Sequence, residues 1–450
     1  MGREELIQLL FKKGREYNIK DLEVYMEENS SLNFNIYEGK LDEYSVSKEE
    51  ILSLRGIYKN KMGYSYTEKM TESSLEEVLH NLIEYAENNG SEYIEVLASP
   101  NDQYKNLKEK TNGLDKYTEE EKIKFLKDIE KEAFSLDTRI TTVDSCEYVE
   151  STKTVFIKNT RGLELEDSHT TGLINLSVVA KDGDDVQTGN SYINFSTLED
   201  RYKSLLVKES VSDALNMLGA ASIESRNYEV ILRNNVAANL FNAFSPIFLG
   251  DIVQRNLSLM KEKIGEKVGS DILNIVEDPS MSNGRVCRAF DDEGTITYSK
   301  YLIEKGILNT FLHNNRTAEK EGLESTGNGF RISHKGSIGV LPTNMYIEPG
   351  DITLNHMINT IEKGIIITDI QGLHAGVNPM SGDFSLSSNG FLIEKGEISR
   401  PISQITIAGN FYNLLKDISA IGNDVKTSFP YMNYFNSPSI KINSLTIAGK

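Results

Sequence analysis

The first half of the chain alternates helical periodicity with short runs in which polar and apolar residues alternate. Apolar positions at helical spacing predict a helix over residues 3–17 and another over 73–89, with Ser73 or Ser74 as its N-cap. Between them, residues 22–68 alternate with a period of two and are interrupted by Glu-Gly, Lys-Glu-Glu and Lys-Asn-Lys turns. This pattern predicts a set of β-hairpins flanked by helices.

The strand pattern then recurs after a further charged helix expected around residues 117–135. Residues 56–68 (GIYKNKMGYSYTE) resemble residues 155–167 (VFIKNTRGLELED), and helices are predicted after both, at 73–89 and 198–219. A weak internal duplication of a strand–turn–strand–helix unit is one explanation. The other is that two unrelated hairpins share the same turn chemistry.

Beyond residue 222 the pattern becomes β-rich, and helices are expected to be few after residue 276. The pentapeptide LIEKG occurs at 302–306 and at 392–396, which predicts two similar hairpins that turn at Lys-Gly. We therefore expect an α+β fold of two closely packed domains, an N-terminal α+β domain at 1–222 and a C-terminal β-rich domain at 223–450. The segments predicted to form the hairpins of the second domain are 297–312, 365–372, 390–402, 405–410 and 439–450.

Composition narrows the classes of function. With 450 residues, 39% of them hydrophobic, the chain can bury sizeable cores in two or three domains. Lys and Arg number 48 against 67 Asp and Glu, a net charge of -19, and no basic cluster is interleaved with aromatics. Nucleic-acid binding is therefore not expected.

The same sequence predicts a reducing, non-membrane location. Only Cys146 and Cys287 are present, and the chain starts with a charged amphipathic helix rather than a signal peptide. No apolar run approaches the roughly 20 residues needed to span a bilayer. We expect a soluble cytoplasmic protein without membrane association.

The six histidines show no metal-binding spacing. None lies within five residues of another, whereas zinc sites commonly start from a His pair on one helix. A site assembled from distant residues stays open. His374 lies between Gly372 and Gly376, which permit close backbone approach, so it is expected to line a cleft rather than to catalyse.

Three loops gather polar residues without matching a catalytic motif. FDDEG (290–294) contains Asp291 and is interpreted as a turn leading into a hairpin, with a cation site as the alternative. TGNG (326–329) and SGDFS (381–385), which contains Asp383, match no Walker-type loop or dinucleotide fingerprint. They are either plain flexible loops or loops beside a cleft. No GxSxG nucleophile elbow occurs.

The most unusual segment is LFNAFSPIFLGD, residues 240–251. It begins as a buried helix, places Pro246 in its middle and ends at Gly250-Asp251. A proline inside a helix costs about 3 kcal/mol, so the helix should end or kink there.

A run of motifs in the second half resembles the TldD/PmbA family, described both as modulators of DNA gyrase and as metallopeptidases. The N-terminal block IYEGK…GIYKNKMGYSYTE fits as well, so the resemblance covers essentially the whole chain. The motifs are GEKVGSDILNIVEDP (265–279), AFDDEGTITYSKYLIEKGILNTFLHNNRTAEKEG (289–322), STGNGFR (325–331), PTNMYIEPGD (342–351) and SGDFSLSSNGFLIEKGEISRPISQITIAGN (381–410).

The resemblance explains the unusual segment. The TldD branch of the family holds zinc with HExxxH and a cysteine near the C-terminus, whereas the PmbA (TldE) branch lacks them. Aligned on Leu-Phe and Gly-Asp, the first His falls on Asn242, the Glu on Ala243 and the second His on Ile247. The last quarter of the chain has no cysteine. The resemblance thus implies the PmbA branch, with no metal bound by this chain.

By this resemblance, the chain is expected to be the non-metal-binding subunit of a heteromeric zinc peptidase acting on unfolded proteins or peptides. A TldD-like HExxxH partner would supply zinc and the general base, while this chain shapes the chamber and holds substrate as an added β-strand. In isolation we expect an inactive homodimer. No catalytic residue or metal ligand is assigned. The residues expected to line the cleft are Asn242, Ala243, Ile247, Asp251, Asp291, His374 and Asp383.

Two other functions stay open. One is a stand-alone homodimeric protein that binds peptides without cleaving them. The other is an enzyme in its own right that uses scattered groups such as His374, Asp291 and Asp383.

Overall fold

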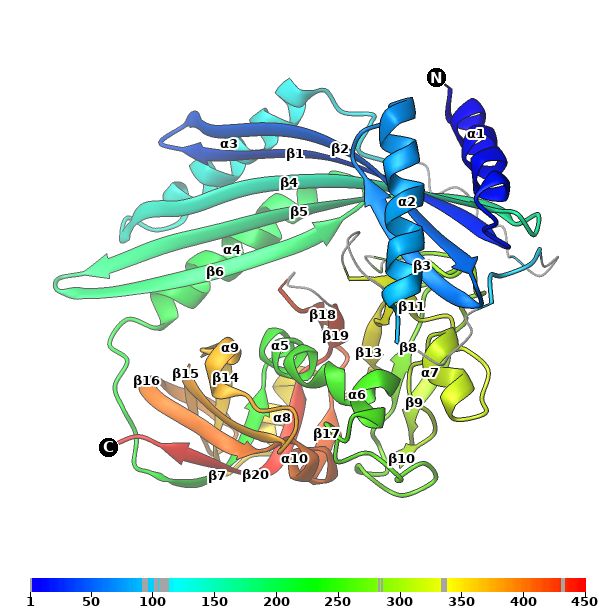
Figure 1. Ribbon diagram of the computed structural model, residues 1–450. Coiled ribbons are helices and arrows are strands. Elements are labelled where there is room, and N and C mark those ends of the chain that lie inside the picture. The colour runs from blue at the N-terminus through cyan, green and yellow to red at the C-terminus, as the bar shows by residue number, and fades with distance from the viewer. Residues whose placement is uncertain are drawn as a thin grey trace.

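A long antiparallel sheet of six strands dominates the first half of the computed structural model, which describes residues 2–90, 96–100, 104, 113–281, 284, 286–332, 338–429 and 434–450 (Figure 1). Its order is β3-β2-β1-β4-β5-β6. The strands are β1 (Leu22–Tyr37), β2 (Lys40–Tyr58), β3 (Lys61–Thr67), β4 (Ile140–Asn159), β5 (Glu164–Asp182) and β6 (Asp185–Phe195).

This half consists of the same unit twice. A helix, three strands and a second helix occur as α1-β1-β2-β3-α2 and again as α3-β4-β5-β6-α4. Because β1 pairs with β4 at the centre, each unit extends toward its own edge of the sheet. The helices are α1 (Arg3–Glu16), α2 (Glu72–Asn88), α3 (Glu119–Leu136) and α4 (Asp200–Asn216).

The topology corrects the proposed correspondence within this repeat. Residues 56–68 span the turn between β2 and β3, but residues 155–167 span the turn between β4 and β5. The two quoted segments are therefore not equivalent hairpins. The repeated unit is also longer than predicted, since it has three strands and a helix on each side.

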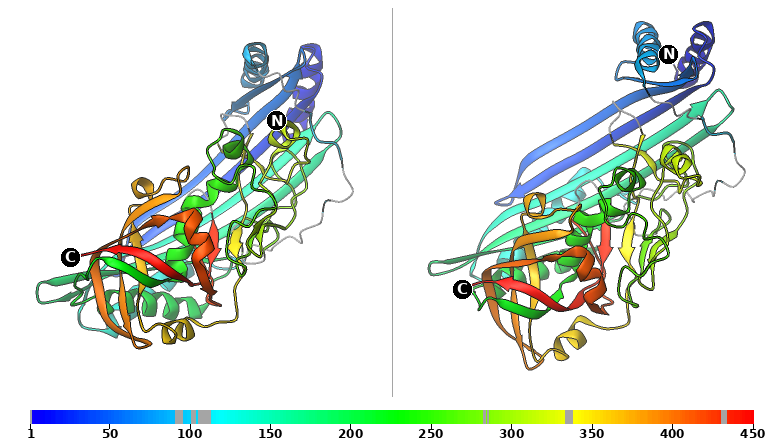
Figure 2. Two further views of the ribbon diagram at one scale, coloured as in Figure 1. Left: turned by 90° about the horizontal axis from the view of Figure 1, so that it is seen from below. Right: turned by 60° about the horizontal axis from the view of Figure 1, so that its bottom comes forward.

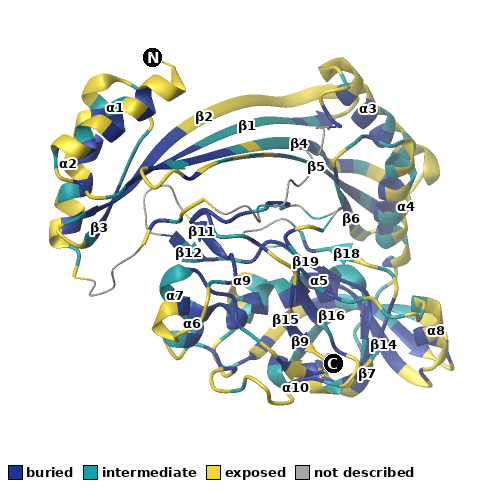
Figure 3. Ribbon diagram, turned by 90° about the vertical axis from the view of Figure 1, so that its right-hand side faces the viewer, coloured by how far each residue is buried: buried dark blue, intermediate teal, exposed yellow. Residues whose placement is uncertain are grey.

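The four helices cover one face of the sheet, and the C-terminal half covers the other. Val24 packs with α1 and α2, and Tyr148 packs with α3 and α4. Side chains alternate along a strand, so Tyr25 and Val155 point to the opposite face, where they pack on Phe290. Figure 3 shows the sheet arching over the C-terminal half.

The C-terminal half is built on a second large sheet of order β16-β15-β14-β7-β20-β17. Because β16 also pairs with β20, five of its strands close into a ring. The central strands β7 and β14 are parallel to each other. The strands are β7 (Arg226–Leu232), β14 (Lys363–Gln371), β15 (Asp383–Glu394), β16 (Glu397–Asn410), β17 (Ile418–Ile421) and β20 (Ile440–Ala448).

Shorter strands lie beside this sheet, and β11, β13, β18 and β19 are the ones nearest the first half (Figures 1 and 2). Six form a sheet of order β10-β9-β8-β13-β19-β18, and two form a ribbon. They are β8 (Ile275–Glu277), β9 (Lys300–Glu304), β10 (Ile307–Leu308), β13 (Met345–Ile347), β18 (Lys426–Thr427) and β19 (Phe435–Ser437), with β11 (Gly329–Arg331) and β12 (Ile338–Val340) as the ribbon.

The two LIEKG hairpins are confirmed. In the first, Lys305 and Gly306 have φ of 48° and 78° between β9 and β10, and in the second Lys395 and Gly396 have φ of 53° and 77° between β15 and β16. Two consecutive positive φ angles define the type I′ turn that suits the twist of a hairpin.

Other predictions for the elements were wrong in detail. Thr71, not Ser73 or Ser74, caps α2 and accepts the N–H of Ser74. Residues 365–372 belong mostly to the single strand β14 rather than to a hairpin. The second half also keeps several short helices, which carry the loops between its strands. They are α5 (Asn234–Phe244), η1 (Ser245–Phe248), α6 (Gly250–Gln254), α7 (Asn315–Lys320), α8 (Leu354–Asn359), α9 (Leu373–Gly376) and α10 (Phe411–Asp417).

The mixed α+β class predicted from the sequence is confirmed. The first sheet ends at Phe195 and the strands of the second half begin at Arg226. In the part of the chain that the structure describes, every helix is too short or too polar to cross a membrane.

Candidate functional site

The segment 240–251 forms the end of α5, the single 3₁₀ turn η1 and the start of α6. Pro246 lies in the first turn of η1, where its missing N–H leaves no bond unmade. In a continuous α-helix the same proline would lose its bond to the carbonyl of Asn242. The predicted interruption is confirmed, because the α-helix ends at Phe244.

The residues at the aligned zinc-motif positions do not fit a zinc ion. Asn242 and Ala243 are half-buried, and Ile247 is fully buried in the core of the C-terminal half. In the same core, the ring of Phe244 stacks on Phe411 with centroids 4.2 Å apart. Zinc needs nitrogen, thiolate or carboxylate donors, and these positions offer only one amide. Among the described residues, no group of three or more His, Cys, Asp or Glu is placed to hold a metal.

Three other predicted cleft residues occupy separate local environments. Asp251 pairs with Arg255 at 3.2 Å. His374 is exposed on the short helix α9. Asp383 is exposed and accepts a hydrogen bond from Asn410 Nδ2 at 2.9 Å, which, with Ser381, lowers the pKa of its carboxyl. The structure does not bring these three groups together with Asp291 through any hydrogen bond or ion pair in the described part of the chain.

Asp291 is buried within the loop FDDEG. Its Oδ1 accepts the N–H groups of Glu293 and Thr295 at 2.9 Å each, and its Oδ2 accepts that of Gly329 at 2.8 Å. Burial and the neighbouring Glu293 raise the pKa of Asp291 well above its ordinary value. The turn interpretation of FDDEG therefore holds, and Asp291 fastens this loop to the TGNG loop.

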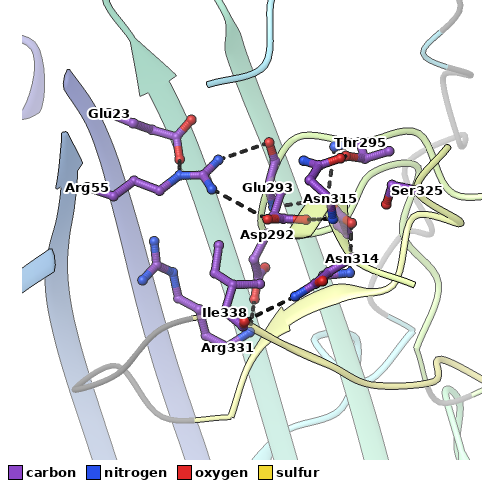
Figure 4. A network of polar contacts seen from close by, with 12 residues as sticks. Glu23, Arg55, Asp292, Glu293, Thr295, Asn314, Asn315, Ser325, Arg331 and Ile338 are labelled. Carbon is purple, nitrogen blue, oxygen red and sulfur yellow. Dashed lines mark hydrogen bonds and ion pairs between the residues drawn. The ribbon is translucent and has the colours of Figure 1, made fainter. Parts of the chain in front are cut away.

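The FDDEG loop is also attached to the first sheet by a buried charge network (Figure 4). Arg55 of β2 donates from Nε to Glu23 at 2.5 Å and from Nη2 to the carbonyl of Glu293 at 3.1 Å. The Glu293 carboxylate lies 3.7 Å from Arg55 Nη1 and accepts the N–H of Asn315 at 2.8 Å. Burial would lower the pKa of Arg55, but the two carboxylates outweigh it and raise it.

A cavity of about 310 Å³ lies beside this network, between the two halves. One wall comes from β1, β4 and β5, and the other from the segments around residues 286–292, 330–331 and 341–343. None of the seven predicted cleft residues lines it. Its polar and apolar lining residues are Asn29, Ser151, Lys153, Val155, Asp167, His169, Thr171, Val286, Arg288, Asp292, Phe330, Arg331, Leu341, Pro342, Thr343 and Tyr434.

Two arginines line this cavity that the sequence did not identify as candidate site residues. Both lie in or next to motifs that were quoted from the sequence. Arg288 precedes FDDEG and donates from Nη1 to Asp292 at 2.6 Å. Arg331 ends the STGNGFR motif, and its N–H donates to the other Asp292 oxygen at 2.8 Å. A charged residue within an apolar run, such as Arg55 in LSLRGIY, is the signal that points to a buried ionic contact.

Family models match three consecutive parts of the chain. The PmbA/TldA metallopeptidase domain 1 matches residues 22–86, the central domain residues 112–218 and the C-terminal domain residues 225–449. The chain belongs to the PmbA/TldD metallopeptidase family.

Individual PmbA/TldD proteins are similar over much or all of the chain. The PmbA metalloprotease homologue of Buchnera aphidicola is 29% identical over 322 residues, which cover 71% of this chain and 68% of that protein. A crystal structure from Thermotoga maritima, described as a modulator of a DNA gyrase, is 30% identical with a TM-score of 0.91, covering 99% of this chain and 100% of the other. TldE from Thermococcus kodakarensis has a TM-score of 0.89 over 99% and 100% of the two chains, and its 23% identity shows the fold alone.

Membership in the PmbA/TldD family makes the side chains of the α5–η1 segment important for the question of metal binding. The family description names a metallopeptidase, yet the helix that ends at Phe244 carries no metal-binding side chain among Asn242, Ala243 and Ile247. This chain therefore has the family fold, with the apolar side chain of Ile247 buried in the core at the third of these positions.

Proposed function

We propose that the chain is the non-metal-binding subunit of a heteromeric zinc peptidase of the TldD/TldE type. The observation that carries this proposal is the pair Ala243 and Ile247, which have no donor atom at two of the three aligned motif positions. Ile247 is also fully buried, so its position serves packing. A TldD-like HExxxH subunit would supply the zinc and the general base.

The preserved scaffold supports a role in shaping a shared chamber. TldE from Thermococcus kodakarensis has the same fold over 99% of this chain, and this shared architecture supports the proposed role. We propose that the chain holds an unfolded protein or peptide as an added strand, a mode that reads backbone rather than side chains. Residue 222 is the proposed domain boundary.

The remaining parts of the proposal concern assembly and location. In the absence of its partner the chain forms an inactive homodimer. It works in the cytoplasm and takes neither nucleic acid nor membrane as a partner, in keeping with its net charge of -19. The separate environments of Asp291, His374 and Asp383 do not favour an enzyme built from these groups alone.

The test is a peptidase assay on an unfolded protein such as reduced, alkylated lactalbumin. This chain, its HExxxH-bearing relative from the same genome and their equimolar mixture are assayed side by side. The proposal expects activity only with the relative present and a clear gain on mixing. Activity of this chain alone, at a level that a chelator abolishes, would contradict it.

A further inference from the structure

Two arginines in the cavity between the halves carry buried nitrogens without a hydrogen-bond partner among the residues that the structure describes. Arg331 is 9% exposed, and its Nε and Nη2 have no such partner. In the part of the chain that the structure describes, no carboxylate lies within ion-pair distance of its guanidinium. Its guanidinium lies over the face of the Tyr25 ring, with the guanidinium carbon 4.3 Å from the centroid.

Arg288 is also a buried arginine of this cavity, but part of its guanidinium is hydrogen-bonded. It is 7% exposed and donates from Nη1 to Asp292, while its Nε lies 3.8 Å from Asp167, too far for a hydrogen bond. Its Nε and Nη2 have no hydrogen-bond partner. The two side chains therefore present four buried nitrogens with unused N–H groups, and both line the cavity.

The acidic groups of the cavity do not cancel the charge of Arg331. Asp292 is held by Arg288 and by the N–H of Arg331. Lys153 pairs with Glu27 at 2.9 Å. Asp167 lies within ion-pair distance of Arg288, 3.8 Å from its Nε, and not of Arg331. A buried cation without a counter-charge is costly, and native proteins rarely leave buried N–H groups unpaired without a reason.

We propose that this cavity binds a carboxylate of a peptide, with Arg331 as the anchor and Arg288 as the second donor. A guanidinium offers a planar fork of N–H groups that matches the two oxygens of a carboxylate. The apolar side chains of Val155, Phe330 and Leu341 suit the chain attached to it. The peptide part rests on the proposed function, whereas the carboxylate part rests on the arginines alone.

The test is calorimetric titration of the full chain with three acetylated peptides. The first has the sequence Ala-Leu-Ala-Leu and a free C-terminal carboxylate, the second is its amide, and the third is an amide with one internal Glu. We expect the first to bind, the second not to bind, and Arg331→Gln to weaken binding about tenfold or more. Binding of the third peptide instead of the first would support the site and assign a side-chain carboxylate as its ligand.

Matched variants keep this test decisive. Arg331→Lys keeps the charge but loses the fork, and is expected to bind more weakly than wild type and more tightly than Arg331→Gln. Arg400→Gln removes an arginine outside the cavity and should leave binding unchanged. Equal binding of the first peptide and its amide, or no binding of any peptide, would overturn the inference. A gain of peptidase activity on mixing is measured separately, so failure of the proposed function is distinguishable.

A different surface carries a second inference. Strand β2 pairs with β1 along its whole length but with β3 only from Leu52 onward. The outer edge of residues 40–50 therefore has no strand beside it in the described structure. All of these residues are exposed, including Tyr44 at 46% and Val46 at 63%. Long exposed edges are templates for pairing with another chain.

This edge is complementary to itself when two copies run antiparallel about Ser45. On one face of the joined sheet, two of the facing pairs then consist of oppositely charged residues, and the third pair is apolar. Cross-strand pairs of these two kinds stabilise a sheet. The pairs are Lys40 with Glu50, Asp42 with Lys48, and Tyr44 with Val46, each formed twice across the two-fold axis.

We infer that a second copy of this chain pairs along residues 40–50 of β2 and joins the two six-stranded sheets. This rests on the proposed homodimer and names its surface. Lys48 has a surface ion pair with Glu28 at 3.0 Å in its own chain, both side chains being largely exposed, so it is available for exchange.

Charge reversal tests this pairing by sedimentation. Lys48→Glu places like charges opposite each other twice, and the dimer should dissociate about tenfold more readily. Adding Asp42→Lys restores opposite signs and should restore the dimer, while Lys20→Glu, an exposed reversal outside β2, should have no effect. If Lys48→Glu leaves the dimer dissociation constant unchanged, the pairing along β2 is wrong, but the proposed homodimer still stands. A monomeric wild type would overturn the homodimer as well.

Discussion

At the scale of single residues, the molecule is defined by buried charges at the junction of its halves. Asp292 is 1% exposed and is held by Arg288 and by the N–H of Arg331. Burial alone would raise the pKa of Asp292, but Arg288 and Lys153 outweigh burial and lower it. Its charge is therefore part of what holds the FDDEG loop to the cavity wall.

This ion pair predicts a pH-dependent loss of stability. Asp292→Asn should lower the free energy of unfolding by about 3–5 kcal/mol at pH 7, because Arg288 loses its buried counter-charge. A depressed folded-state pKa stabilises above the unfolded pKa of about 4, and that contribution disappears as pH falls through the folded pKa. Urea unfolding at pH 7, 5 and 3.5 should show the difference between variant and wild type shrinking toward acid. A difference independent of pH would show that the charge is not its cause.

The chemistry of this segment also predicts that substituting the three HExxxH residues is not enough to create a zinc site. The triple variant Asn242→His, Ala243→Glu, Ile247→His should retain no stoichiometric zinc after dialysis, measured by plasma mass spectrometry. The helix ends at Phe244, position 247 is buried in the apolar core, and the last quarter of the chain has no cysteine. The variant should also unfold more readily, since a polar ring would replace a fully buried isoleucine. One tightly held zinc per chain would contradict this account of the segment.

At the scale of elements, each repeat of the first half relies on one glycine where its third strand meets the following helix. A Cβ on Gly63 of β3 would lie 2.2 Å from the carbonyl oxygen of Leu82 in α2. A Cβ on Gly189 of β6 would lie 1.9 Å from that of Ser210 in α4. The two contacts occupy corresponding places in the repeated unit, which supports duplication more strongly than the sequence similarity of its turns.

These two contacts predict that adding a methyl group at either glycine destabilises the protein by a similar amount. Gly63→Ala and Gly189→Ala should each lower the free energy of unfolding by about 1–3 kcal/mol or more, because backbone must move to admit the methyl group. Gly90→Ala is the control, since nothing lies within 4 Å of its added Cβ. Thermal and urea unfolding measure all three. A neutral result at Gly63 and Gly189 would show that helix and strand are not packed this closely.

Elements were predictable where local chemistry decides them, and less so where distant contacts do. Helices such as α1 and α3 follow from their apolar periodicity, and the LIEKG turns from Lys-Gly at positive φ. The pairing of β1 with β4 depends on residues more than a hundred positions apart, which no local pattern reveals. The hairpin correspondence was wrong because residues 56–68 span the second turn of their unit and residues 155–167 the first turn of theirs. Of the candidate site, Pro246 was interpreted correctly from its chemistry. The cavity arginines were missed because no local pattern places Arg331 over Tyr25.

At the scale of the whole molecule, the two halves are linked by polar contacts, and the Arg55 network is one of them, with a cavity beside it. Arg55 and Glu23 come from the first sheet, and Glu293 from the second half, so the network of Figure 4 forms only when the halves pack together. The family fold extends over both halves. The chain thus has the fold of the PmbA/TldD metallopeptidase family, and α5 packs into the core of its second half.

The most direct test of this account is the zinc content of the chain alone and of its complex with the HExxxH-bearing relative, measured after dialysis against a weak chelator. We expect no stoichiometric zinc in the chain alone and one zinc for each pair of subunits in the complex, lost when the HExxxH motif of the relative is mutated. One zinc per chain in the isolated protein would contradict the account, and would mean that residues other than Asn242, Ala243 and Ile247 hold the metal.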